Sequence, residues 1–370
     1  MSRPFAVIAG GGTGGHIQPA LAVASELVER GHPPSSLLFV GSRRGLEARL
    51  VPEAGYPLVL LPGRGIPRRL SLTSLVSAAG LALAAARAIV LLASRRPSVV
   101  LSVGGYASLP CALAAVVLRI PLVVTEQNAR AGSANRLVAR FARASAVAFP
   151  GTGLPREVVT GNPVRPEIAG ADRSAEGRRK ARAELDLPED RLVLAVMSGS
   201  LGARSVNRAT LGLVERWASR LDLSVHHAVG SRDWPEISAA LPSPPGLFYR
   251  AVEYEDRMPL VLEAADLFLG RAGGTTVAEL AAVGVASVLV PLPIAPGDHQ
   301  TANGRALERQ GAAVLVPDAE CSADRLAAII EPLLADPGRL ENMGEAARRV
   351  GGPGAAGRVA DLVERHGARR

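Results

Sequence analysis

The sequence predicts an α/β protein made of two doubly wound domains, and three observations carry this prediction. The chain has 370 residues, which is enough for two domains of ordinary size. Hydrophobic residues make up 48% and charged residues 21%, as expected for a packed globular protein. Each half also begins with a short apolar run that leads into a glycine-rich turn and then a helical stretch, at Phe5–His16 and at Leu192–Arg204.

Strand-like apolar runs alternate with helical stretches along both halves, which favours parallel sheets built from strand–helix–strand units. In the first half we expect strands at Phe5–Ala9, Leu37–Val40, Leu58–Leu61, Val99–Val103, Leu122–Thr125 and Ala146–Phe149. In the second half we expect strands at Leu192–Met197, Leu223–Ala228, Leu247–Ala251, Leu267–Leu269, Ser287–Val290 and Ala313–Leu315.

The segment Gly161–Pro166 carries two prolines, a glycine and an asparagine, a composition that suits a crossover between domains. We therefore expect an N-terminal domain over 1–162 and a C-terminal domain over 163–340. The tail over 341–370 is helical by pattern, is broken at Gly351–Gly354, and is expected to pack back on the N-terminal domain.

Composition excludes several function classes. Lys180 is the only lysine, so no P-loop can be present. The net charge is +8, but aromatic residues make up only 3%, which argues against nucleic-acid binding. Cys111 and Cys321 form neither a metal-ligand spacing nor a disulfide framework, and the first predicted strand begins close to the N-terminus without a signal peptide. A reducing cytoplasm is the expected compartment.

A long apolar stretch, Leu70–Ser94, is interrupted by Arg87 and flanked by arginines. Three interpretations remain open: a buried crossover helix, a helix that spans a membrane, and a helix that lies on a membrane surface with an arginine rim.

The first glycine turn fits the pattern Gly10-x-Gly12-x-x-Gly15, which is typical of phosphate binding after a strand. Two arginines after the next predicted strand, Arg43 and Arg44, would suit binding of NADP. The alternative is a tight strand-to-helix turn that binds no ligand, which would need the same glycines. His16 follows at the predicted helix start, where it can act as a base or cap the helix.

Three loops in the second half follow predicted strands and carry polar or glycine residues. Ser198–Arg204 offers backbone N–H groups and the Ser200 hydroxyl for a diphosphate. Gly270–Glu279 opens a helix in which Glu279 can accept hydrogen bonds from ribose hydroxyls. Pro296–Asn303 supplies carboxylate and amide groups that suit a sugar. Each loop can also be read as an ordinary helix cap or surface loop.

The first half adds two further strand ends, Ser102–Tyr106 and Thr125–Asn128. Ligands of open α/β sheets bind at this edge, so Tyr106, Glu126 and Asn128 are candidate site residues, or else scaffold residues. No Asp-x-Asp motif occurs in the sequence, so a metal-chelated nucleotide-sugar site of that kind is not expected.

Seven motifs in family order resemble the MurG family of bacterial N-acetylglucosaminyltransferases. They are GGGTGGH, SVGGYAS, TEQN, GNPVR, SGSLGAR, GRAGGTTVAE and DHQTAN, and they extend along nearly the whole chain. The resemblance implies the GT-B fold, in which two Rossmann-like doubly wound domains face each other across a cleft. It also implies inverting transfer of N-acetylglucosamine from its UDP carrier to undecaprenyl-pyrophosphoryl-N-acetylmuramoyl pentapeptide, which makes lipid II from lipid I in peptidoglycan synthesis.

By motif, the family's donor contacts fall on Thr13, Gly14, Gly15, Asn128, Arg165, Ser200, Gly274, Thr275, Thr276, Val277, Ala278, Glu279 and Gln300. The acceptor-side candidates are His16, Tyr106 and Glu126, with His16 the first choice and Glu126 the second choice of general base. The chain departs from the family pattern at Ser198 and Leu201, which replace glycine and glutamine, and at Thr125, which replaces histidine. No base contact is assigned near Glu253–Glu255.

The resemblance further implies no metal site and no obligatory cofactor, with stimulation by Mg²⁺ left open. An anionic membrane surface is an expected partner and nucleic acid is not, with a peripheral location on the cytoplasmic face of the inner membrane. The alternatives are another UDP-sugar enzyme of the same fold (a diacylglycerol glycosyltransferase or a UDP-N-acetylglucosamine epimerase), an NADP oxidoreductase, and a noncatalytic UDP-sugar-binding partner.

Overall fold

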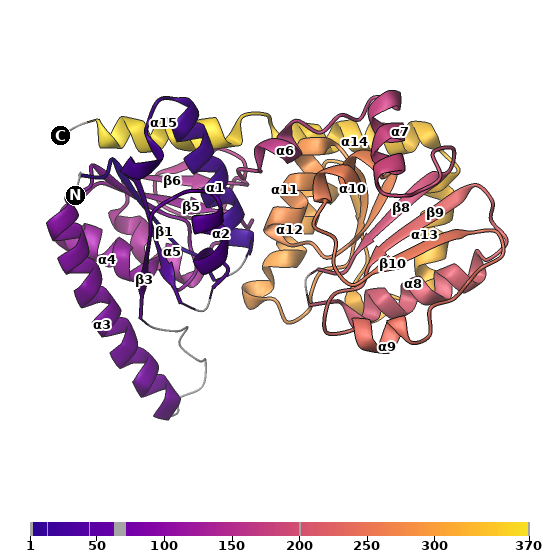
Figure 1. Cartoon of the computed structure of the whole chain (residues 1–370), viewed down its shortest axis with the longest axis horizontal. Coiled ribbons are helices and arrows are strands. Elements are labelled where there is room, and N and C mark those ends of the chain that lie inside the picture. Colours follow the sequence, from indigo (N-terminus) through magenta and orange to yellow (C-terminus); the bar gives the residue numbers. More distant parts are fainter. Residues whose placement is uncertain (1–2, 13, 44, 63–71, 200, 369–370) are drawn as a thin grey trace. The chain divides into compact units, whose positions relative to one another are not determined.

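The computed structural model describes residues 3–12, 14–43, 45–62, 72–199 and 201–368. The chain divides into two compact units (Figure 1). Unit 1 contains Met1–Arg165 together with Gly354–Arg370, and unit 2 contains Pro166–Pro353. The change from one unit to the other lies at Arg165, three residues beyond the expected boundary.

Unit 1 is built on a seven-stranded parallel sheet with the order β3-β2-β1-β4-β5-β6-β7. Six strands correspond to the predicted apolar runs, and the short edge strand β7 was not predicted. The strands are β1 (Ala6–Ala9), β2 (Leu37–Ser42), β3 (Leu58–Leu61), β4 (Val99–Ser102), β5 (Leu122–Glu126), β6 (Ala144–Val147) and β7 (Glu157–Val159).

Helices cover both faces of this sheet, because side chains alternate along each strand. Ala6 and Ile8 of β1 join one core with α1 and α15. Val7 and Ala9 point to the opposite face and join a second core with α3 and α4. The helices are α1 (Gly14–Glu29), α2 (Glu47–Glu53), α3 (Leu72–Arg95), α4 (Leu109–Val117), α5 (Ser133–Val138) and α15 (Ala355–Gly367), with 3₁₀ turns at Pro34–Ser36 and Ala139–Phe141.

Unit 2 repeats the same winding in a six-stranded parallel sheet with the order β10-β9-β8-β11-β12-β13. All six strands were predicted within one residue at each end. They are β8 (Leu192–Met197), β9 (Leu223–Ala228), β10 (Phe248–Val252), β11 (Leu267–Gly270), β12 (Ala286–Leu289) and β13 (Ala313–Leu315).

The helices of unit 2 again lie on both faces of the sheet (Figure 1). Leu194 and Val196 of β8 pack with Val206 and Leu213 of α8 in the main core. The helices are α6 (Pro166–Ala169), α7 (Ala175–Glu184), α8 (Arg204–Arg216), α9 (Trp234–Ser238), α10 (Met258–Ala264), α11 (Gly274–Val283), α12 (His299–Glu308), α13 (Ala323–Leu334) and α14 (Pro337–Gly351), with 3₁₀ turns at Pro296–Asp298 and Asp318–Glu320.

The tail does not pack on unit 1 as one body, which corrects the expectation for 341–370. Helix α14 packs against α11 and stays in unit 2, whereas α15 packs against α1 in unit 1. The division falls at Gly352–Gly354, where Gly352 and Gly354 adopt positive φ angles and Pro353 cannot continue a helix.

Helix α3 is the crossover between β3 and β4, and its described side chains Ala84, Ala88 and Leu92 are buried in the core shared with α4. Within the part of the chain that the structure describes, no helix has the length and apolar character that a membrane span needs. The flanking Arg68 and Arg69 lie outside the described residues.

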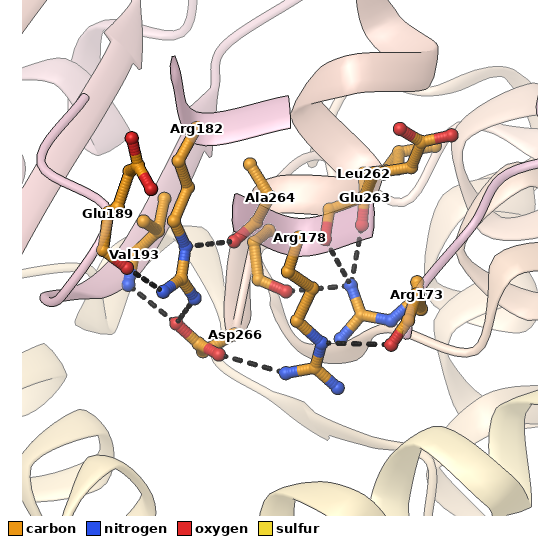
Figure 2. Close-up of polar contacts among 10 residues, drawn as sticks. Arg173, Arg178, Arg182, Glu189, Val193, Leu262, Glu263, Ala264 and Asp266 are labelled. Atoms are coloured by element: carbon orange, nitrogen blue, oxygen red, sulfur yellow. Dashed lines mark hydrogen bonds and ion pairs between the residues drawn. The ribbon is translucent and has the colours of Figure 1, made fainter. Parts of the chain in front are cut away.

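A cluster of arginines in and just before α7 contacts the end of α10 and the amino ends of β8 and β11 (Figure 2). Asp266 accepts hydrogen bonds from Arg182 at 2.8 Å, from Arg178 at 3.0 Å and from the Val193 N–H at 2.7 Å. Arg173 donates to the carbonyls of Leu262 and Ala265 at the end of α10, where a cation is favourable.

The same cluster concentrates positive charge, since three arginines surround one buried carboxylate. Burial, followed by the neighbouring Arg178, lowers the pKa of Arg173 to about 9. These arginines lie at the strand ends opposite to the motif loops, so their role is to hold α7 and α10 on the sheet.

Candidate functional site

In both units the motif loops meet where the strand order reverses, which is where open α/β sheets bind ligands. In unit 1, the Gly10–His16 turn follows β1 and the Ser102–Tyr106 loop follows the neighbouring β4. In unit 2, the Ser198–Arg204 loop follows β8 and Gly270–Gly274 follows the neighbouring β11. The fold therefore brings together loops that lie far apart in the sequence.

His16, in the first turn of α1, lies against the glycine pair that follows β4. A Cβ atom added to Gly104 would lie 3.1 Å from His16 Cδ2, and one added to Gly105 would lie 3.6 Å from His16 Cε1. Both glycines adopt positive φ angles. The Gly104–Gly105 turn thus leaves room for the imidazole, which is half-buried at the carboxyl end of the sheet.

Glu126 ends β5, is only 3% exposed, and accepts four hydrogen bonds. Oε1 accepts from the Asn128 N–H at 3.1 Å and from Asn128 Nδ2 at 3.2 Å. Oε2 accepts from the Gly132 N–H at 2.9 Å and from Asn135 Nδ2 at 2.8 Å. The carboxylate therefore fixes the loop that carries Asn128.

Tyr106 belongs to a polar cluster that links the loop after β4 to the first glycine turn. The Tyr106 hydroxyl donates to Ser42 Oγ at 3.1 Å, and Ser42 Oγ donates to Glu47 Oε1 at 2.8 Å. Glu47 Oε2 accepts the Gly12 N–H at 2.7 Å. Sequence reasoning missed Ser42 and Glu47.

In unit 2, Ser198 is buried at the end of β8 and hydrogen-bonds to Asn207 of α8. Asn207 also contacts His227 Nε2 at 3.0 Å and donates to Asp233 Oδ2 at 2.9 Å. Burial, followed by the charge of His226, lowers the pKa of His227 to about 3, so its imidazole is neutral at physiological pH. This network links Ser198, at the start of the Ser198–Arg204 loop, to Asn207 of α8, the helix that follows the loop.

The Gly274–Glu279 segment forms the first turns of α11 after β11. Val277, Ala278 and Glu279 are buried, with Glu279 8% exposed. Just before it, Arg271 donates to Asp318 at 2.6 Å and to Ser205 Oγ at 3.2 Å. Arg271, which sequence reasoning passed over, ties the start of α8 to this loop.

Gln300 lies in the first turn of α12, after β12. Its Oε1 accepts the Leu292 N–H at 3.0 Å, so the side chain holds the loop that leads into α12. Asn303, one turn further on, is fully buried and donates to the Ala272 carbonyl at 3.1 Å. The DHQTAN motif therefore supports the neighbouring GRAGGTT loop.

Two predicted site residues, Thr13 and Ser200, lie outside the described residues, and Arg165 is the last residue of unit 1. Glu255, in the stretch left without an assignment, is internal. Burial alone would raise its pKa, but hydrogen bonds from His226 and Arg257 lower it overall. Throughout the described ranges, no three His, Cys, Asp or Glu side chains are grouped so as to hold a metal ion.

Two parallel sheets of the same winding, each with glycine and polar loops at the point where the strand order reverses, give this protein the GT-B architecture. The glycosyltransferase family 28 N-terminal domain matches residues 6–147, and the C-terminal domain of the same family matches residues 193–365. The chain belongs to this family and is a glycosyltransferase.

Full-length relatives specify the family further. A protein of Clavibacter sepedonicus is 43% identical over 96% of this chain and 95% of its own length. A protein of Acidothermus cellulolyticus is 43% identical over 98% of both chains. Both are named UDP-N-acetylglucosamine–N-acetylmuramyl-(pentapeptide) pyrophosphoryl-undecaprenol N-acetylglucosamine transferase, and this chain is a member of that N-acetylglucosamine transferase family.

The solved structures agree with the GT-B assignment. MurG of Acinetobacter baumannii superimposes with a TM-score of 0.76 at 29% identity, covering 99% of this chain and 100% of that one. The calicheamicin glycosyltransferase CalG4 (TM-score 0.65, 20% identity) and a UDP-GlcNAc 2-epimerase of Neisseria meningitidis (TM-score 0.66, 13% identity) share the fold alone.

Proposed function

We propose that this enzyme transfers N-acetylglucosamine from UDP-N-acetylglucosamine to the 4-hydroxyl of lipid-linked N-acetylmuramoyl pentapeptide, with inversion at the anomeric carbon. The 43% identity to transferases of that name over nearly the whole chain carries the proposal. The position of the motif loops at the carboxyl edges of both sheets supports it. The reaction converts lipid I to lipid II.

The donor is assigned mainly to unit 2. Backbone N–H groups of the Ser198–Arg204 loop and the amino end of α8 suit the diphosphate, which leaves as UDP. We assign Glu279 to accept hydrogen bonds from the ribose and Gln300, in the first turn of α12, to contact the sugar. No cofactor is obligatory in this mechanism, and Mg²⁺ would act only as a stimulant.

His16 is the proposed general base for the acceptor hydroxyl. It is half-buried at the ligand edge of unit 1. Both oxygens of Glu126 accept hydrogen bonds, from Asn128, Gly132 and Asn135. Glu126 would have to release these donors before it could accept a proton. Its geometry therefore favours a role in positioning Asn128, and Tyr106 remains the acceptor-side contact.

The test compares His16→Ala with Glu126→Gln across pH, using a soluble lipid-linked acceptor. We expect His16→Ala to lower kcat by about 10²–10⁴-fold, the usual contribution of a positioned base, and to abolish the acidic limb of the pH profile. Loss of that limb in Glu126→Gln instead would reverse the assignment. Absence of transfer by the unaltered enzyme would refute the proposed function.

An anionic membrane surface is the proposed partner of α3 and α4, which places the enzyme peripherally on the cytoplasmic face of the cell membrane. Leu83 and Val90 of α3 are 49% and 69% exposed, and Val117 of the adjacent α4 is 66% exposed. Arg87, Arg96 and Arg119 are exposed on the same two helices or directly beyond their ends. Apolar residues beside arginines suit an interface with anionic headgroups.

A further inference from the structure

Glu47 is a buried carboxylate placed at the first glycine turn of unit 1. It is 1% exposed, although it lies in the first turn of the short surface helix α2. Its Oε2 accepts the Gly12 N–H at 2.7 Å, and its Oε1 accepts the N–H and the hydroxyl of Ser42 at 2.7 and 2.8 Å. All three partners are donors, which favours an ionised carboxylate.

Three glycines lie directly against this carboxylate. A Cβ atom added to Gly11 would lie 2.2 Å from Glu47 Cδ, one added to Gly41 would lie 2.4 Å from Cγ, and one added to Gly45 would lie 1.9 Å from Oε2. A side chain at any of the three positions would displace the Glu47 carboxylate from this place. Glycines of this turn, of β2 and of the loop after β2 therefore leave the space that an internal anion occupies.

Phosphate-binding glycine turns offer the same chemistry to a ligand, namely backbone N–H groups directed at a negative charge. Here the Gly12 N–H is already engaged by a carboxylate of the protein itself. Ser42 extends the contact to the Tyr106 hydroxyl. Glu47 thereby couples the glycine turn, the end of β2 and the loop after β4.

We infer that Glu47 is a positioning residue for the acceptor half of the site, acting as a built-in substitute for a phosphate at the Gly12 N–H. The assignment of the acceptor to unit 1 rests on the proposed function. The carboxylate fixes the turn before His16 and orients Tyr106 through Ser42. A ligand phosphate that reaches this turn has to bind N–H groups other than that of Gly12.

The test uses the full-length enzyme with Glu47→Ala and Glu47→Gln. In Glu47→Gln the amide nitrogen would face one of three donors, so one contact is lost although the volume is kept. We expect kcat/KM for the lipid-linked acceptor to fall by about tenfold or more in both variants, the worth of a hydrogen bond to a charged group. The affinity for UDP, measured by calorimetry, should remain close to that of the unaltered enzyme, because the diphosphate and ribose contacts proposed above lie in unit 2.

Rescue by added formate separates the proposed role of Glu47 as an anion from a role in packing alone. In Glu47→Ala formate can enter the vacated space and accept the same donors, so it should raise both the melting temperature and kcat/KM. Sodium chloride at equal ionic strength should not. Glu53→Gln, an exposed carboxylate at the other end of α2, is the matched control and should respond to neither salt. Should Glu47→Ala fail to fold, Ser42→Ala cuts the link to Tyr106 and should lower kcat/KM for the acceptor in the same way.

Two results would overturn the inference. One is a kcat/KM for the acceptor in Glu47→Gln equal to that of the unaltered enzyme, and the other is an equal loss of UDP affinity and of kcat/KM for the acceptor. The absence of any formate effect on Glu47→Ala would also overturn it. If the unaltered enzyme does not use the lipid-linked acceptor, the proposed function fails. The formate effect on melting temperature still tests the built-in anion in that case.

Discussion

His227 Nε2 lies 3.0 Å from Asn207 Oδ1, at the base of the Ser198–Arg204 loop. Asn207 Oδ1 also bonds to Ser198, while Nδ2 donates to the Val229 carbonyl at 3.1 Å and to Asp233 at 2.9 Å. Every hydrogen-bonding position of the amide is thus used. His227 must carry its proton on Nε2, so its Nδ1 accepts from the Tyr249 hydroxyl at 3.0 Å.

Asn207→Ala should destabilise unit 2 by about 2–3 kcal/mol, because it leaves several buried polar groups without partners. Trp217 and Trp234 are the only tryptophans and both lie in unit 2, so urea unfolding followed by tryptophan fluorescence reports on this unit. The donor KM should rise as well. Asn342→Ala, an exposed asparagine of α14, should change neither quantity.

Unit 2 should lose stability as the pH falls below 6.5. The folded-state pKa of His227 is lowered to about 3, so between about pH 6.5 and 3 the unfolded state binds one proton more than the folded state. The free energy of unfolding should therefore decrease, by about 2 kcal/mol between pH 7 and pH 5. His227→Gln should flatten this dependence, whereas His299→Gln should leave it unchanged.

Asp266→Ala should cost about 3–5 kcal/mol of unfolding free energy, because it leaves the buried Arg182 without its counter-charge. Asp222→Ala removes an exposed partner of Arg220 and should cost at most about 1 kcal/mol. Tryptophan fluorescence again gives the measurement. Similar losses of unfolding free energy in the two variants would contradict the structural role of the arginine cluster around Asp266.

Glu279→Ala should raise the donor KM by the equivalent of about 1–3 kcal/mol, the worth of one or two hydrogen bonds to the ribose. Steady-state kinetics at saturating acceptor give the value. Glu341→Ala, an exposed carboxylate of α14, is the control and should leave the donor KM unchanged. An unchanged donor KM in Glu279→Ala would remove this residue from the donor site.

Binding to phosphatidylglycerol vesicles should be reversible and should weaken with salt, since each well-placed arginine contributes about 1 kcal/mol that mobile ions screen. Val90→Glu should weaken co-sedimentation by about tenfold, through loss of apolar contact and added repulsion. Leu221→Glu is the matched control, because Leu221 is 70% exposed in unit 2 and Val90 is 69% exposed in unit 1. Equal effects of the two substitutions would mean that α3 does not face the membrane.

Most strands could be predicted from the sequence, because parallel strands buried on both faces are continuous apolar runs. The exception in unit 1 is β7, which has three residues, of which Val158 and Val159 are 41% and 52% exposed. Such an edge strand has no hydrophobic pattern. The position of the motif loops followed from the same logic, since most predicted loops came directly after a strand, and Pro296–Asn303 lies further along the chain after β12.

The polar networks beneath these loops could not be predicted in the same way. Glu47 and Gly12 are 35 residues apart, and Asn207 and His227 are 20 apart. No periodicity or motif connects residues at such separations, and only the folded sheet brings them together. The division of the tail was missed for a similar reason, because helical periodicity does not indicate which unit a helix packs on.

The return of α15 to unit 1 has a consequence for synthesis on the ribosome. Val359 and Val363 share a core with Ile8 and Ile17, so the N-terminal unit lacks part of its core until α15 has been made. Unit 2 is continuous over Pro166–Pro353 and can fold as soon as it emerges. The half that is translated first is therefore completed last, and a nascent chain stalled just before Ala355 would carry a finished second unit beside an unfinished first one.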